Sequence, residues 1–139
     1  MNKFGGVGVA IVTPFNVNGD VDYVGLQKLV NHLISGGVDY LVVQGTTGES
    51  PVITASEKRK ILDLVIEVNE KRLPIVYGLG GNNTLNVCNA IKKMDLSGVD
   101  GLLSVSPYYN KPSQIGLFQH YKMVAEVSEI PVILYNVPS

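Results

Sequence analysis

The sequence predicts an α/β fold built on a parallel sheet. Five short apolar runs alternate with four longer segments of helical periodicity. The short runs are apolar at consecutive positions, as in strands that are buried on both faces. The expected strands begin about 30 residues apart, which is the length of a strand–helix–strand unit. No linker, charge block or low-complexity tract interrupts the alternation, so residues 1–139 are expected to lie in one domain without an internal boundary.

The expected elements follow from their apolar spacing and their ends. The strands, rich in β-branched residues, cover Gly8–Val12, Tyr40–Val43, Ile75–Tyr77, Gly101–Val105 and Val132–Tyr135. The helices carry an apolar stripe at spacings of three and four residues. They cover about Tyr23–Ser35, Ala55–Asn69, Leu85–Ser97 and Gln114–Val127. Thr54 and Glu57 form the pattern of a capping box at the start of the second helix.

Two architectures agree with this order of elements. One is a five-stranded doubly wound sheet of the flavodoxin-like type, which is complete at about this length. The other is a (β/α)8 barrel, which needs about 250 residues. Val132–Tyr135 has the pattern of a buried strand and only a turn follows it, whereas a doubly wound domain closes with a helix over its last strand. We therefore expect the first five strands and four helices of a (β/α)8 TIM barrel, as the N-terminal part of a single barrel domain.

Unusual polar residues gather directly after the expected strands. In a barrel these strand ends converge on one face, where active sites lie. The segments are Thr13–Phe15, Gly45–Ser50, Gly78–Asn83, Ser106–Pro112 and Tyr135–Asn136. In the second segment, Gly45 and Gly48 let the backbone approach a ligand closely, and Thr46 and Thr47 offer hydroxyl and N–H groups to an anion such as a carboxylate. Tyrosine and threonine hydroxyls in one pocket could also pass protons between a substrate and water.

Purely structural interpretations of these segments remain open. Gly45–Ser50 could be a tight turn that caps the next helix. Gly78–Gly81 is glycine-rich but does not match the G-x-G-x-x-G phosphate-binding pattern. Tyr108 and Tyr109 could anchor an interface, and Tyr135 could be a core tyrosine whose hydroxyl is satisfied.

Composition and charge exclude several classes of function. The net charge of −1 gives no support to a nucleic-acid or anionic-membrane surface. Cys88 is the single cysteine, which excludes an internal disulfide and suits a reducing compartment; we expect it in the core. No apolar run reaches the ~20 residues that span a bilayer, and residues 1–6 lack the apolar stretch of a signal peptide. We therefore expect a cytoplasmic protein.

The remaining titratable residues give no sign of a metal site. No group of His, Cys, Asp and Glu has metal-ligand spacing. His32 and His120 fall inside expected helices and are expected to be surface or packing residues. The run Lys58-Arg59-Lys60 is expected to form a solvated helix face.

Four motifs together resemble the dihydrodipicolinate synthase (4-hydroxy-tetrahydrodipicolinate synthase) family of the pyruvate-dependent class I aldolase and lyase superfamily. They occur in the family's order and spacing across essentially all 139 residues, as Val9–Phe15, Gly45–Ser50, Pro107–Pro112 and Leu134–Pro138. The G-x-x-G-E turn is common to the superfamily. The Thr-Thr pair together with Pro-Tyr-Tyr-Asn points to the synthase rather than to N-acetylneuraminate lyase or sugar-acid aldolases. A non-catalytic half-barrel or flavodoxin-like binding module is the alternative outside the enzyme class.

The resemblance implies a lyase that condenses pyruvate with aspartate semialdehyde through a Schiff base, in lysine and diaminopimelate biosynthesis. It implies a homotetramer, a dimer of dimers, and no metal or organic cofactor, because a cationic imine is the electron sink. By motif, Thr47 and Gly48 would bind the pyruvate carboxylate. Thr46, Tyr109 and Tyr135 would form a proton relay, with Tyr109 reaching into the neighbouring subunit's site.

The sequence departs from the family pattern in two ways. The family's Schiff-base lysine lies at the end of the sixth strand and its substrate-binding arginine directly after Ser139, so neither falls within these residues. We therefore expect residues 1–139 alone to be inactive. Lysine-inhibited members bind lysine near the residues that match Ser50, Asn82 and Tyr108. Where those members carry histidine and glutamate, this chain has a different set, namely Ala55, Lys58 and Asn86. The resemblance therefore implies weak or absent feedback inhibition.

Overall fold

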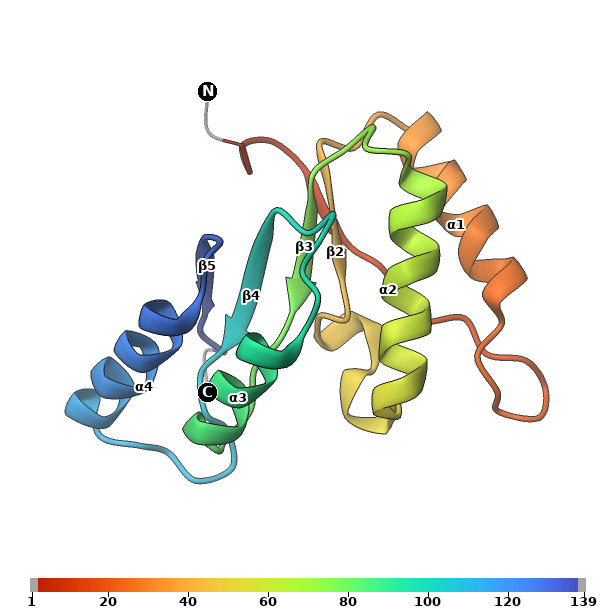
Figure 1. Ribbon diagram of the computed structural model, residues 1–139. Coiled ribbons are helices and arrows are strands. Elements are labelled where there is room, and N and C mark those ends of the chain that lie inside the picture. Colours follow the sequence, from red (N-terminus) through yellow and green to blue (C-terminus); the bar gives the residue numbers. More distant parts are fainter. Residues whose placement is uncertain (1–2, 138–139) are drawn as a thin grey trace.

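The computed structural model describes residues 3–137 and contains one parallel β-sheet (Figure 1). Residues 1–2 and 138–139, including Pro138 of the last motif, lie outside the described range. The strands are β1 (Gly8–Ala10), β2 (Tyr40–Val43), β3 (Ile75–Gly78), β4 (Gly101–Val105) and β5 (Val132–Tyr135). Their order in the sheet is β1-β2-β3-β4-β5, and every neighbouring pair is parallel.

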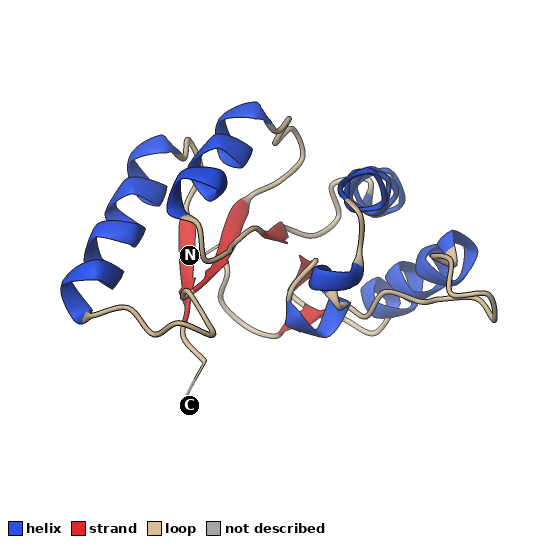
Figure 2. Cartoon of the chain, turned by 90° about the horizontal axis from the view of Figure 1, so that it is seen from below, coloured by secondary structure: helices blue, strands red, loops and turns tan. Residues whose placement is uncertain are grey.

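Four α-helices connect the strands, and two short 3₁₀ turns follow β2. The helices are α1 (Tyr23–Ser35), α2 (Ala55–Asn69), α3 (Thr84–Lys93) and α4 (Gln114–Val127), and the 3₁₀ turns are η1 (Thr46–Gly48) and η2 (Ser50–Val52). The strands follow a curve, and the four α-helices lie along its outer side (Figure 2). No helix among residues 3–137 is long and apolar enough to cross a membrane.

The strand order decides between the two expected architectures. A doubly wound sheet changes direction at a switch point and carries helices on both faces. Here the spatial order equals the chain order, and right-handed crossovers then place every helix on the same face. The expected barrel segment of five strands and four helices is confirmed, and the flavodoxin-like alternative is wrong.

The two faces of the curved sheet bury different residues. Leu41 and Ile75 are aligned across β2 and β3, and both belong to the hydrophobic cluster that also contains helix residues such as Leu26. Val42 and Val76, one position further along each strand, therefore point to the inner side of the curve. Most side chains of the helix-facing layer are fully or almost fully buried. This layer positions the strand ends on which the candidate site is built.

Helix ends match the expectation where a local cap defines them. Thr54 and Glu57 form both hydrogen bonds of the capping box that opens α2. The expected Leu85–Ser97 helix is wrong at its end, because α3 stops at Lys93. The Asp95 side chain instead accepts a hydrogen bond from the backbone N–H of Ser97, which forms a turn of its own.

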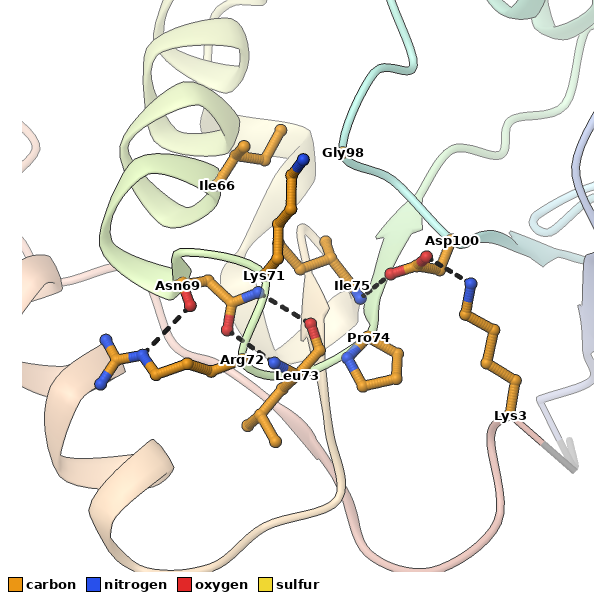
Figure 3. Close-up of a pocket in the computed structure, with 10 residues that line it drawn as sticks. All are labelled: Lys3, Ile66, Asn69, Lys71, Arg72, Leu73, Pro74, Ile75, Gly98 and Asp100. Atoms are coloured by element: carbon orange, nitrogen blue, oxygen red, sulfur yellow. Dashed lines mark hydrogen bonds and ion pairs between the residues drawn. The ribbon is translucent and has the colours of Figure 1, made fainter. Parts of the chain in front are cut away.

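Polar contacts fasten the amino-terminal ends of the strands, around a cavity of about 370 Å³ (Figure 3). The Asn69 side chain donates to the carbonyl of Leu73 at 2.7 Å and accepts from its N–H at 3.2 Å. Asp100 accepts from the Ile75 N–H at 2.7 Å and pairs with Lys3 at 2.6 Å. These contacts hold the loops before β3 and β4. Stability devices of this kind are expected at this face of a barrel, opposite the catalytic face.

Candidate functional site

The turn after β2 presents two threonines at the carboxyl end of the strand. Thr46 and Thr47 open the 3₁₀ turn η1 and are exposed, whereas Gly48 is buried. The Thr13 hydroxyl donates to the Gly48 carbonyl oxygen at 2.7 Å, and the Gly48 N–H donates to the Gly45 carbonyl at 3.0 Å. Within residues 3–137 the Thr46 and Thr47 hydroxyls and N–H groups make no hydrogen bond, and both residues are exposed, so these groups are available to a ligand.

The end of β3 approaches this turn more closely than any side chain would permit. A Cβ atom on Gly78 would lie 2.1 Å from the Gln44 carbonyl oxygen. Gln44 itself is buried and has a positive φ of 59°. The position of the Gly45–Gly48 turn therefore depends on a bare backbone at position 78.

The loop after β4 holds its two tyrosines differently. The Asn82 side chain donates to the Tyr108 carbonyl and accepts from the Tyr108 N–H at 2.7 Å. Tyr109 has φ of 70°, and the Asn110 N–H donates back to the Tyr108 carbonyl at 2.9 Å, which makes a γ-turn. That turn is strained for a tyrosine, and strain of this kind persists where the surroundings enforce it. Tyr109 is 98% exposed, so its phenol projects away from the rest of the chain.

The end of β5 carries Tyr135 on the inner side of the curved sheet. Tyr135 is aligned with Val105 of β4, and Val105 alternates with the helix-facing Ser104. The Tyr135 carbonyl accepts from the Ser106 N–H at 2.8 Å, which continues the β4–β5 pairing beyond the strand. The Tyr135 side chain is half-buried and lines the main cavity.

A cavity of about 670 Å³ joins several strand ends with the space between α2 and α3. The residues expected to be functional divide into two groups. Those that line the cavity are Thr46, Ser50, Asn82, Tyr108 and Tyr135. Those that do not line it are Thr47, Gly48 and Tyr109. The described half of the barrel therefore assembles the first group, while Tyr109 points outward.

The helix run Lys58-Arg59-Lys60 was predicted to form a solvated face. This is wrong for Lys58, whereas Lys60 is exposed and the Arg59 side chain is 35% exposed. Lys58 lines the cavity, and burial lowers the pKa of its ammonium below the usual value. Arg59 donates to the Asp95 carbonyl at 2.7 Å and pairs with Asp63. The helical pattern does not reveal these two environments, because each depends on residues outside α2.

Two other expectations from the sequence are confirmed. Cys88 is buried in the hydrophobic cluster. His120 is a packing residue, buried on α4, with its Nδ1 atom 2.8 Å from the Thr84 hydroxyl oxygen. Burial lowers the pKa of its imidazole.

Comparison with known proteins identifies the family of this chain. The model of the dihydrodipicolinate synthetase family matches residues 3–139. The chain belongs to this family. A 4-hydroxy-tetrahydrodipicolinate synthase of Flavobacterium psychrophilum is 54% identical over 138 residues, which are 99% of this chain and 47% of that protein. The corresponding synthase of Cytophaga hutchinsonii is 51% identical over 99% of this chain and 46% of its own length.

Solved structures confirm the barrel fold for this member of the dihydrodipicolinate synthetase family. The dihydrodipicolinate synthase of Thermotoga maritima superposes with a TM-score of 0.93 at 42% identity, over 99% of this chain and 46% of that one. The dihydrodipicolinate synthase of Acinetobacter baumannii, solved with pyruvate, superposes with a TM-score of 0.91 at 46% identity, over 96% of this chain and 46% of that one. An N-acetylneuraminate lyase of Mycoplasma synoviae is more distant in sequence. It superposes with a TM-score of 0.87 at 28% identity, over 99% of this chain and 48% of that one. The chain spans about half the length of the relatives it matches.

Proposed function

We propose that the protein containing this chain is a 4-hydroxy-tetrahydrodipicolinate synthase, which condenses pyruvate with aspartate semialdehyde through a Schiff base. The observation that carries the proposal is that the pair of threonines after β2 and Tyr135 at the end of β5 lie at the same face of a barrel segment. The identities of 54% and 51% to synthases, against 28% to an N-acetylneuraminate lyase, favour this reaction over other pyruvate aldolases.

In the proposed site, Thr47 and Gly48 bind the carboxylate of pyruvate. The exposed Thr47 hydroxyl and the backbone N–H groups of a 3₁₀ turn are suitable donors for a carboxylate. The pyruvate bound by the Acinetobacter baumannii relative supports this assignment of the substrate.

Thr46, Tyr109 and Tyr135 form the proposed proton relay. A lysine amine condenses with the ketone of pyruvate and releases water, and loss of a methyl proton gives an enamine. The enamine carbon then bonds to the aldehyde carbon, and the relay exchanges protons between the reacting atoms and bulk water. Thr46 and Tyr135 line one cavity, whereas Tyr109 is held outward by its γ-turn. We propose that Tyr109 completes the relay in a neighbouring subunit, within a homotetramer arranged as a dimer of dimers. This site needs no metal or organic cofactor.

The Schiff-base lysine is proposed to lie outside residues 1–139. Lys58 lines the cavity from α2, and Lys111 is exposed in the loop after β4, so neither projects from the end of a strand into the inner side of the sheet. A chain of residues 1–139 alone should therefore show no condensation activity. The test is a coupled assay of that chain beside the natural protein that contains it. Turnover by the natural protein is expected, and turnover by residues 1–139 above background would contradict the assignment.

Weak or absent inhibition by lysine is proposed for this protein. Ser50, Asn82 and Tyr108 line the cavity, but its described lining contains no carboxylate and includes the ammonium of Lys58. The side-chain ammonium of a bound lysine molecule would therefore find no carboxylate as counter-ion in this lining, and it would be repelled by the ammonium of Lys58. Titration with lysine should leave turnover unchanged, whereas tight inhibition would refute the proposal.

A cytoplasmic location is also proposed, supported by the buried, unpaired Cys88 and the biosynthetic relatives.

A further inference from the structure

A tyrosine of α4 reaches the carboxyl ends of two strands. The hydroxyl oxygen of Tyr121 lies 2.9 Å from the Ser106 hydroxyl oxygen, 3.2 Å from the Ser104 carbonyl oxygen and 3.4 Å from the Tyr135 carbonyl oxygen. Tyr121 therefore links α4 to the ends of both β4 and β5. Its ring also meets the buried His120 ring edge-on, with centroids 5.1 Å apart and an interplanar angle of 77°.

Three donors converge on the backbone oxygen of Tyr135. The Ser106 N–H lies 2.8 Å away, the Ser106 hydroxyl 3.2 Å and the Tyr121 hydroxyl 3.4 Å. A carbonyl oxygen has two lone pairs, and each hydroxyl has one proton to give. The contact between the two hydroxyls can run in either direction. If Tyr121 donates to Ser106, the Ser106 hydroxyl is able to donate to the Tyr135 carbonyl; if Ser106 donates to Tyr121, the Tyr121 hydroxyl is able to donate to that carbonyl. Either direction leaves one of the two hydroxyls able to reach the Tyr135 carbonyl.

The backbone of Tyr135 is held by contacts from outside its own strand. The residue is the last of β5, and its carbonyl accepts the N–H that continues the pairing with β4. The direction of its side chain therefore depends on how its own backbone is held. Within residues 3–137, the polar contacts that hold that carbonyl come from Ser106 and Tyr121.

We propose that Tyr121, together with Ser106, is a positioning residue for Tyr135. It fixes the backbone of Tyr135 so that the phenol enters the cavity in one orientation. This inference rests on the proposed function, in which Tyr135 relays protons. It predicts that removing one hydroxyl on the far side of the strand slows proton transfer without weakening the binding of pyruvate at the β2 turn.

The test compares Tyr121→Phe and Ser106→Ala with the parent in the natural protein that contains these residues. Tyr23→Phe is the matched control, because Tyr23 lies on α1 and its hydroxyl makes no hydrogen bond within residues 3–137. Both test variants should lower kcat by about tenfold, a fraction of what acid–base catalysis contributes. The KM for pyruvate should stay within about twofold of the parent value, because the groups that bind pyruvate at the β2 turn are unchanged. The Tyr23→Phe control should have the kcat and KM of the parent.

A second readout does not depend on turnover. With ¹³C-labelled tyrosine, the Tyr135 ring signal is assigned by its loss in Tyr135→Phe. Tyr121→Phe should shift or broaden that signal, and Tyr23→Phe should leave it unchanged. An unchanged Tyr135 signal in Tyr121→Phe and Ser106→Ala overturns the inference, as does an unchanged kcat in an active protein. If the parent has no synthase activity, the proposed function fails, and the ring signal still decides whether Tyr121 positions Tyr135.

Discussion

Substitution of Gly78 by alanine tests whether the close approach of β3 places the β2 turn. A Cβ at this position would lie 2.1 Å from the Gln44 carbonyl oxygen, 2.6 Å from the Gln44 carbonyl carbon and 2.9 Å from the Gly45 nitrogen. Cβ contacts below 3.0 Å are essentially never found, so the oxygen must retreat from 2.1 Å to at least 3.0 Å, a displacement of 0.9 Å or more. Gln44 and Gly45 lead directly into Thr46 and Thr47, so the displacement reaches the proposed carboxylate site.

The substitution is expected to affect both catalysis and folding. A misplacement of about 1 Å can cost about 100-fold in rate, and overpacking costs about 1–3 kcal/mol of unfolding free energy. We expect Gly78→Ala to lower kcat/KM for pyruvate by about 100-fold in the natural protein that contains these residues. Steady-state kinetics and urea unfolding measure the two quantities separately.

Gly81→Ala is the matched control for this prediction. Gly81 lies in the same strand-end segment, and an added Cβ would meet Val87 at 3.5 Å, an ordinary contact. Its backbone, like that of Gly78, does not have positive φ. The reasoning is refuted if the two variants have the same kcat/KM, because steric displacement of the β2 turn would then have no consequence.

Three further predictions concern binding, stability and pH. Thr47→Val should raise the KM for pyruvate roughly tenfold or more, through loss of a hydrogen bond to a charged group, whereas Thr47→Ser should not; equal KM values would exclude the assigned role. Thr54→Ala should lower the free energy of unfolding by about 1 kcal/mol while Thr54→Ser retains the cap, as urea unfolding can measure. Burial lowers the pKa of His120 from the usual imidazole value of 6.5, so just below pH 6.5 the unfolded state binds more protons than the folded state. The free energy of unfolding should therefore fall as the pH drops through 6.5. Thermal unfolding from pH 7.5 to pH 5 should show this dependence weakened in His120→Asn but kept in His32→Asn, and the same slope in both would contradict it.

Local sequence signals predicted most of the fold. The bounds of α1, α2, α4, β2, β4 and β5 agree with the sequence because caps and apolar periodicity act over a few residues. The end of α3 could not be predicted in this way. It depends on the turn at Asp95, whose carbonyl is held by Arg59 from another helix. The sequence carries no direct signal for strand order either, because the order depends on pairing between residues far apart in the chain.

The motifs supplied the proposed residues of the candidate site but not their arrangement. The motif identified Thr46, Tyr109 and Tyr135, yet no sequence pattern shows that Tyr109 points outward while Tyr135 lines the cavity. The contact between Tyr121 and the end of β5 also escaped prediction, since it joins residues 14 apart through packing of α4 on the sheet. Such contacts form only when helices pack on strands, so apolar periodicity and sequence motifs do not predict them.

The most direct test of the proposed chemistry is to trap the Schiff base. The natural protein that contains these residues is incubated with pyruvate and borohydride, and the modified lysine is located by peptide mass mapping. The account predicts one reduced pyruvate per chain, attached to a lysine outside residues 1–139, with trapping weakened in Thr47→Val. Absence of any adduct, or an adduct on Lys58, Lys111 or another lysine within residues 1–139, would contradict it.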